Sequence, residues 1–237
     1  MTRILVTYAT MAGSTVEVAE AIAAELDEQG IDVDTRPMSE VDTLAGYDGV
    51  IAGGPMIMGW HRAARAFLRR HRREWGRLPL AVFVTAVTLT DTGDLGGAGR
   101  VFVDDRLPKP PARAGRLSFR ERYARLSNYL RPIEAAARPA TPAAVGVFGG
   151  RREFGRLPGG AGPFGALVIR PPAGDPRNSG GRFECGRLPG WGVLFVARVT
   201  RAPAGGRRNW EAIRAWATAL PAALGLAEPA PEGASVQ

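Results

Sequence analysis

The residues best suited to chemistry lie in a short loop near the amino terminus. Residues 10–15 read Thr-Met-Ala-Gly-Ser-Thr, with hydroxyl groups on Thr10, Ser14 and Thr15 and a glycine at position 13. An apolar run precedes the loop and a helical pattern follows it. The N–H groups at a helix start favour an anion, and Gly13 allows a turn tight enough for several of them to converge. The loop is predicted to bind a phosphate group, and an ordinary capped turn is the alternative.

Two common nucleotide-binding signatures are missing from this loop. It contains no lysine, which a P-loop NTPase requires, and no G-x-G-x-x-G follows the apolar run. The sequence therefore gives no support to nucleotide hydrolysis or to dinucleotide binding.

The rest of the pattern places the loop at the edge of a parallel sheet. Five apolar or alternating segments predict strands, at 3–8, 31–36, 49–54, 78–87 and 143–150. Helical patterns separate them, which indicates a doubly wound, three-layer α/β/α fold with a five-stranded parallel sheet. In such a sheet a ligand binds beyond the carboxyl ends of the strands, where the strand order reverses.

Local signals mark where several of these helices begin. Ser14 with Glu17, and Ser118 with Glu121, have the spacing of capping boxes. The second box opens a pattern with apolar residues at helical spacing through residue 133, and residues 209–220 predict a closing helix. Between strand and helix, the glycine- and proline-rich segment 88–116 is predicted to be one long loop.

The formal charge of +8 is carried almost wholly by arginine, since Lys109 is the only lysine. Arginine suits phosphates, carboxylates and anionic surfaces, although an arginine-rich genome would give the same composition. Arg62, Arg65, Arg69 and Arg72 are spaced by three, four and three residues, which predicts a basic stripe on one helical face. A solvated helix face is the alternative. No base-reading motif accompanies the arginines, so nucleic acid is not expected as a partner.

Composition also limits the class of protein. With one cysteine, Cys185, and two histidines, His61 and His71, the chain has no ligand cluster at metal-site spacing, so no metal is expected. There is no run of 18 or more apolar residues and no signal-peptide pattern at the start. These features predict a cytoplasmic protein, with peripheral contact at the inner face of the membrane left open.

Three segments, in this order, resemble those of flavodoxins. Residues 10–15 resemble the loop that wraps the FMN phosphate with hydroxyls and amides, although Met11 and Ala12 stand where flavodoxins usually carry hydroxylated residues. "GGPMIMGW" at 53–60 and "VTAVTLTD" at 84–91 resemble the two loops beside the flavin ring. The resemblance covers most of residues 1–148. It implies FMN as cofactor, bound by Thr10, Met11, Ala12, Gly13, Ser14, Thr15, Pro55, Met56, Ile57, Met58, Gly59, Trp60, Thr85, Ala86, Val87 and Thr88.

Within that group the sequence is most similar to menaquinone-dependent protoporphyrinogen dehydrogenases. A basic helix follows the loop after the third strand, the loop after the fourth strand lacks an aromatic residue, and an arginine-rich connection precedes the last helix. The resemblance implies an enzyme that oxidises protoporphyrinogen IX and passes electrons to a quinone. An uncovered ring face would admit the substrate, with Trp60 either covering the other face or serving as a packing residue.

The resemblance assigns roles to a few residues and leaves other functions open. Arg62, Arg65 and Arg69 would hold substrate carboxylates or an anionic surface, and His61 is a weak candidate for proton transfer, with a plain helix-start histidine as the alternative. Two other functions remain open: a flavodoxin-type electron carrier with a redox partner protein, and a flavin-free basic binding module.

A tandem duplication follows the last predicted strand. "GGRREFGRLPG" at 149–159 returns as "GGRFECGRLPG" at 180–190. Two copies are too few for a solenoid, so units 149–179 and 180–210 are predicted to form an enlarged loop within one domain, residues 1–224. Residues 225–237 are predicted to be a disordered tail.

Overall fold

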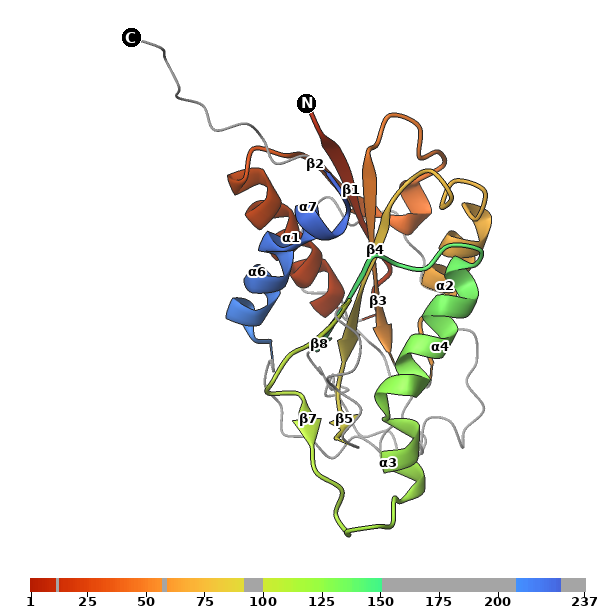
Figure 1. Ribbon diagram of the computed structural model, residues 1–237, viewed down its shortest axis with the longest axis vertical. Helices are drawn as coiled ribbons and strands as arrows, with labels where there is room; N and C mark the ends of the chain where they lie inside the picture. Colours follow the sequence, from red (N-terminus) through yellow and green to blue (C-terminus); the bar gives the residue numbers. More distant parts are fainter. Residues whose placement is uncertain (12, 57–58, 92–99, 151–207, 227–237) are drawn as a thin grey trace, which may run out of the picture.

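A parallel sheet forms the centre of the molecule (Figure 1). The computed structural model describes residues 1–11, 13–56, 59–91, 100–150 and 208–226. Six strands lie in the order β2-β1-β3-β4-β8-β6, all parallel to their neighbours. Their bounds are β1 Arg3–Tyr8, β2 Asp32–Pro37, β3 Gly49–Met56, β4 Leu80–Ala86, β6 Val101–Val103 and β8 Ala144–Gly149. The five long strands are the five that the sequence predicts, and the three-residue β6 adds an edge strand.

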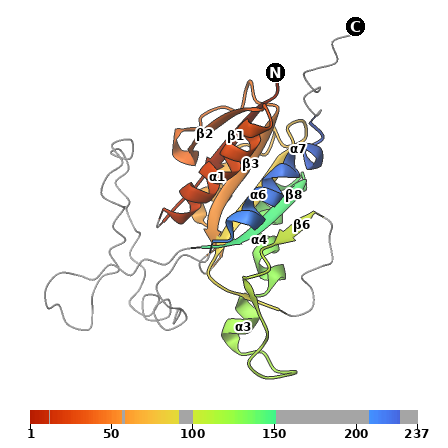
Figure 2. The same cartoon turned by 90° about the vertical axis from the view of Figure 1, so that its left-hand side faces the viewer.

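Helices cover both faces of the sheet (Figure 2). One face packs against α1, Ser14–Glu28, and α6, Trp210–Thr218, followed by the short α7, Leu220–Ala223. The other face packs against α2, Arg62–Arg70, and α4, Leu126–Ala137. A 3-10 turn, η1 at Met38–Glu40, follows β2. The fold is the predicted three-layer α/β/α arrangement. Across the described ranges, no helix has both the length and the apolar character needed to cross a bilayer.

Burial of the central strands explains their apolar sequences. Every residue of β3, β4 and β8 is buried, whereas β2 at the sheet edge is half-buried to exposed along its length. Packing is close enough to require a glycine on β3: a Cβ on Gly53 would lie 1.9 Å from the Phe83 ring. Central strands buried on both faces read as continuous apolar runs, which is why the sequence identifies them.

Several local expectations are wrong. The capping box at Ser14 and Glu17 does not form, because Gly13 is the N-cap of α1 and no side chain caps it. Segment 88–116 is not one long loop: within its described part lie β6 and the paired short strands β5, Leu89–Thr90, and β7, Pro108–Lys109.

The helical pattern that begins at Ser118 is also two helices rather than one. The capping box of Ser118 and Glu121 is confirmed, and it opens the five-residue α3, Phe119–Tyr123, before the chain breaks and α4 begins at Leu126. At the other end, Leu226 packs against the core and its N–H donates to the Pro221 carbonyl at 2.9 Å, so the predicted tail does not begin at 225.

The carboxylate of Asp104 joins the ends of three elements. Its side chain is fully buried just after β6 and accepts hydrogen bonds from the Gly149 N–H at 3.3 Å and from Asn209 Nδ2 at 3.2 Å. Gly149 ends β8, and Asn209 is the N-cap of α6, accepting from the Ala212 N–H at 3.3 Å. Most of the duplication lies outside the described residues, but its two boundaries, near Gly149 and Asn209, are thus held together.

We expect one copy of the duplication to be dispensable for folding, because the clamp fixes the boundaries whatever the length between them. Deleting residues 149–179 joins Phe148 to Gly180 and regenerates the "FGGR" junction from the second copy. Doubling a flexible loop costs only about 0.6 kcal/mol, so the deletion should change the free energy of unfolding little. Chemical denaturation of both proteins measures this difference. A deletion variant that fails to fold would show that the second copy belongs to the core.

Candidate functional site

The strand order reverses between β1 and β3, because β2 lies on one side of β1 and β4 lies beyond β3. β1 pairs with β3, and β3 pairs with β4, so the segments that follow these strands leave the sheet at adjacent positions. All three predicted cofactor loops follow these strands. The fold therefore brings their starting points to one edge, where ligands bind in sheets of this kind.

The predicted phosphate loop forms a tight turn into α1. Gly13 has φ +80° and ψ −23°, a left-handed conformation, and its N–H donates to Thr10 Oγ1 at 3.0 Å. Its carbonyl accepts from the N–H groups of Val16 and Glu17 at 3.0 and 3.3 Å. The N–H groups of Ser14 and Thr15 belong to the first turn of the helix, where no earlier carbonyl of the helix can pair with them. This is the arrangement that favours an anion, although Ala12 lies outside the described residues.

Thr15 and Thr85 join two of the predicted loops. Their Oγ1 atoms lie 3.0 Å apart, and the residues are 1% and 3% exposed. Thr15 is in the first turn of α1 and Thr85 is near the end of β4. The Thr15 hydroxyl therefore connects the start of α1 to the sheet. The backbone N–H of Thr15 takes no part in this contact and is left for an anion.

An ion pair lies beside the phosphate loop. Glu17, in the first turn of α1, pairs with Arg208, whose guanidinium also lies over the Trp210 ring at 4.9 Å. Burial lowers the pKa of Arg208. The pair offsets the negative charge that Glu17 would otherwise place next to a bound phosphate.

The first predicted ring loop is shorter than expected. β3 continues through Pro55 and Met56, and Met56 forms an antiparallel bridge with Trp60. The His61 N–H also donates to the Pro55 carbonyl at 3.1 Å, so the loop leaves and rejoins the sheet at nearly the same place. Gly59 has φ +110°, whereas Ile57 and Met58 lie outside the described residues.

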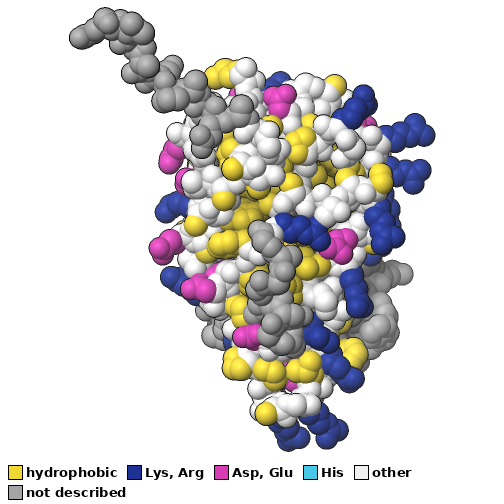
Figure 3. Space-filling view, in the orientation of Figure 1, with side chains coloured by type: hydrophobic (Ala, Val, Ile, Leu, Met, Phe, Trp, Pro, Cys, Tyr) yellow, Lys and Arg dark blue, Asp and Glu magenta, His cyan; other side chains and the backbone are white. Residues whose placement is uncertain are grey.

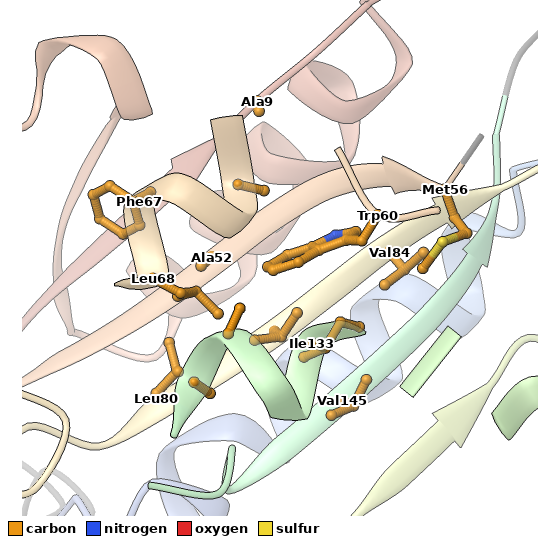
Figure 4. Close-up of a cluster of buried hydrophobic side chains, with 14 of the residues drawn as sticks. Ala9, Ala52, Met56, Trp60, Phe67, Leu68, Leu80, Val84, Ile133 and Val145 are labelled. Atoms are coloured by element: carbon orange, nitrogen blue, oxygen red, sulfur yellow. The ribbon is translucent and has the colours of Figure 1, made fainter. Parts of the chain in front are cut away.

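Trp60 is a packing residue rather than a cover for a ring. Its side chain is 1% exposed and lies between the sheet and the helices of one face, near Met56, Val84 and Ile133 (Figure 4). A Cβ on Gly54 would lie 3.1 Å from Trp60 Nε1, so the indole rests against β3. The expectation that Trp60 stacks on a cofactor is wrong, and the packing alternative is the one that holds. The Met56 thioether is also in this core.

The second predicted ring loop is held by α4. Thr85 and Ala86 are the last residues of β4, and Val87 and Thr88 follow them, half-buried. The Tyr129 hydroxyl, from α4, donates to the Thr88 carbonyl. Burial raises the pKa of Tyr129, which keeps this donor protonated. The backbone of the loop is therefore fixed by a buried phenol from the helix layer.

His61 and Arg65 lie at the start of α2, next to the first ring loop. His61 is the N-cap, and its Nδ1 accepts from the Ala63 N–H at 3.3 Å. Burial, followed by the nearby Arg65 charge, lowers the pKa of His61, so the ring is neutral at pH 7 with Nε2 left for other contacts. The helix-start alternative for His61 is what the structure shows, and a proton-transfer role stays a prediction.

The basic stripe is shorter than expected. Arg62, Arg65 and Arg69 lie on α2, where Arg62 and Arg69 are exposed and Arg65 is half-buried. Arg72 is not part of the stripe, because α2 ends at Arg70. The Arg65 Nε atom is buried without a hydrogen-bond partner in the structure.

Sequence patterns missed the residues that fix the site from a distance. Asp104, Tyr129 and Arg208 act through partners 45, 41 and 191 positions away, a separation that no local pattern reveals. Tyr129 carries one usable signal: it lies three residues after Leu126 and four before Ile133, on the buried face of α4.

Comparison with known proteins gives one family match. A family model described as a flavodoxin domain matches residues 5–152. No curated protein matches the chain.

Several solved structures are similar to part of this chain. Rubredoxin:oxygen oxidoreductase from Desulfovibrio gigas is 16% identical with a TM-score of 0.34, over 39% of this chain and 24% of that one. The two-electron reduced flavodoxin of Megasphaera elsdenii is 13% identical with a TM-score of 0.41, over 61% and 84%. The flavodoxin of Fusobacterium nucleatum bound to flavin mononucleotide is 19% identical with a TM-score of 0.33, over 37% and 53%. This chain thus spans about a quarter of the first structure and about half of the third.

The contact between Thr15 and Thr85 can be tested by a double-mutant cycle. Thr15→Val leaves the Thr85 hydroxyl buried without its partner, which should lower the free energy of unfolding by about 1–3 kcal/mol. The double variant Thr15→Val/Thr85→Val should lose less than the sum of the two single variants, because both polar groups are gone. Urea denaturation gives the four values, with the exposed Thr35→Val as control. Strict additivity would contradict the contact.

Proposed function

This chain belongs to the flavodoxin-domain family, and on that premise we propose that it is an FMN-dependent oxidoreductase. The observation that carries the proposal is the turn at Gly13, which directs the first N–H groups of α1 toward the reversal point of the strand order. Hydroxyl and amide groups there suit the phosphate of FMN. The family match supports the same cofactor.

The residues of the site are compatible with FMN. The amides of Ser14 and Thr15 would bind the phosphate, with Glu17 neutralised by Arg208. The loops after β3 and β4 would flank the ring through their backbones, since the loop held by Tyr129 is fixed in place. The two ring loops contain one aromatic residue, Trp60, and its indole is in the core. That favours a ring with an accessible face, and therefore an enzyme rather than a carrier.

We further propose a substrate class and an acceptor. When bound, FMN supplies a two-electron acceptor for a reduced substrate and a donor for a quinone. The resemblance to protoporphyrinogen dehydrogenases supports a tetrapyrrole dicarboxylate as the substrate. The helix α2, which carries Arg62, Arg65 and Arg69, begins at the same sheet edge, and these arginines would pair with the carboxylates of the substrate. His61 is neutral through burial, and because Nδ1 accepts from the Ala63 N–H its ring proton lies on Nε2, so in proton transfer Nε2–H would act as the donor to the bound substrate or flavin.

A cofactor titration tests the first part of the proposal. Gly13→Val places a β-branched residue at φ +80°, which forces the turn to change, so FMN affinity should fall at least about tenfold. Gly46→Val is a matched control, because Gly46 has φ +85° in the turn before the amino end of β3, whereas the predicted loops follow the carboxyl ends of the strands. Flavin absorbance and fluorescence measure binding to each protein. If the parent protein takes up no FMN, the flavin-free basic module is the function that remains. If the parent, Gly13→Val and Gly46→Val bind FMN with equal affinity, the turn at Gly13 is not part of the site.

Steady-state kinetics test the second part. With FMN bound, the parent should oxidise protoporphyrinogen IX in the presence of a quinone. The triple variant Arg62→Gln/Arg65→Gln/Arg69→Gln should raise KM for the dicarboxylate about tenfold or more and change KM for the quinone little.

The control for this triple variant has the same charge change in the turn after α2, where Arg72, Arg73 and Arg77 are exposed. Arg72→Gln/Arg73→Gln/Arg77→Gln should leave both KM values near those of the parent. An FMN-loaded parent that shows no turnover with any quinone, but is reduced rapidly by a flavodoxin reductase, would favour the electron-carrier alternative.

A further inference from the structure

Formal charge is distributed unevenly along this chain. Residues 1–105 contain ten basic and fifteen acidic residues, a net charge of −5, whereas residues 106–125 contain seven basic and one acidic residue, a net charge of +6. The whole chain carries +8. A uniformly arginine-rich composition would not produce this contrast. Residues 106–125 are called the basic tip below.

The basic tip projects beyond the sheet at the edge that carries the candidate site (Figure 1). It contains β7, the following turn and α3, and α3 buries none of its own side chains. Six of its seven basic residues are exposed: Arg106, Lys109, Arg113, Arg116, Arg120 and Arg122. In the space-filling view, dark blue side chains are visible at this lower end, and others lie along the right-hand side (Figure 3). The core therefore does not require these charges.

The tip has a fixed conformation. Glu121 accepts from the N–H groups of Ala112 and Ser118, both at 2.6 Å, and its own N–H donates to Ser118 Oγ at 3.3 Å. Hydrogen bonds from the Ala112 N–H first, and then from the Ser118 side chain and N–H, lower the pKa of Glu121 to about 2, so the carboxylate stays ionised and engaged within the tip. The one acidic residue of the tip thus closes the turn, and the arginines point outward from a closed structure.

An aromatic residue lies among these charges. Phe119 is 61% exposed at the first position of α3, and the neighbouring residues Arg116 and Arg120 are exposed on either side of it in the sequence. An exposed apolar ring with exposed arginines close to it in the sequence suits the headgroup region of an anionic bilayer, where the ring reaches the acyl boundary and the arginines meet phosphates.

The shape of the tip favours a bilayer over an acidic protein. A stable protein interface buries roughly 800 Å² on each partner around a packed core of anchor residues. The tip is a projecting end with one five-residue helix, one exposed large aromatic residue and six exposed basic residues. Mobile lipid headgroups can surround such an end, whereas a rigid partner would meet only part of it.

We propose that the basic tip docks onto anionic phospholipid bilayers, with Phe119 entering the headgroup region and the tip arginines pairing with lipid phosphates. The acidic helix α1 supports one orientation, because it has five carboxylates and no basic residue. An anionic surface attracts the tip and repels α1, which turns the carboxyl edge of the sheet toward the membrane. The inference does not depend on FMN, since it rests on charge and exposure alone.

Vesicle co-sedimentation of the full-length protein tests this proposal. The parent should bind vesicles that contain phosphatidylglycerol, should not bind vesicles of phosphatidylcholine alone, and should dissociate as salt is raised. Arg116→Gln/Arg120→Gln/Arg122→Gln should weaken binding on the order of a hundredfold, at about fivefold for each charge. Phe119→Ser should weaken it several-fold at unchanged net charge.

The matched control is Arg72→Gln/Arg73→Gln/Arg77→Gln, which removes the same charge from the turn after α2 and should bind nearly as the parent does. Circular dichroism checks folding, which the variants should keep because α3 has no buried side chain. Equal losses in the two triple variants would show attraction by net charge alone and overturn the docking site. A parent that ignores anionic vesicles also overturns it, whether or not it binds an acidic protein.

Discussion

The buried carboxylate of Asp104 is the constraint on which this edge of the molecule depends. A carboxylate without solvent is costly unless hydrogen bonds satisfy it, and Asp104 accepts from the Gly149 N–H, Asn209 Nδ2 and the Arg106 N–H, the last at 3.1 Å. Its own N–H donates to the Val147 carbonyl. Because these partners belong to the end of β8, the cap of α6 and the start of the basic tip, one side chain fixes the relative positions of all three.

The same clamp determines what lies beside the phosphate loop. Asn209 caps α6 and fixes where that helix begins, and α6 packs along α1 on the same face of the sheet. Arg208, one residue earlier, is thereby brought to Glu17 at the start of α1. The charge beside the phosphate loop therefore depends on Arg208, which lies 191 positions after Glu17 in the sequence.

Sequence periodicity predicts the strands, but it does not predict the position of a side chain that a residue distant in the sequence determines. The five long strands and the order of their loops follow from apolar runs, since strands buried on both faces have no polar alternative. Trp60 illustrates the failure: the sequence predicts that it borders the cofactor, but Trp60 forms a bridge with Met56 and its indole is buried in the core. The capping box predicted at Ser14 is wrong for a local reason, because Gly13, in a left-handed conformation, is the N-cap of α1.

The distribution of arginine gives the site its particular character. The candidate phosphate loop has no basic side chain of its own, and among the described residues its arginine neighbour, Arg208, is engaged with Glu17. Attraction of an anion there must come from the N–H groups of Ser14 and Thr15 and from the α1 dipole, which act over one helical turn. Within the described part of the chain, exposed arginines lie instead on α2 and the tip. If both proposals hold, short-range binding of the phosphate and long-range attraction to an anionic surface belong to separate elements, so the surface would not compete for the loop.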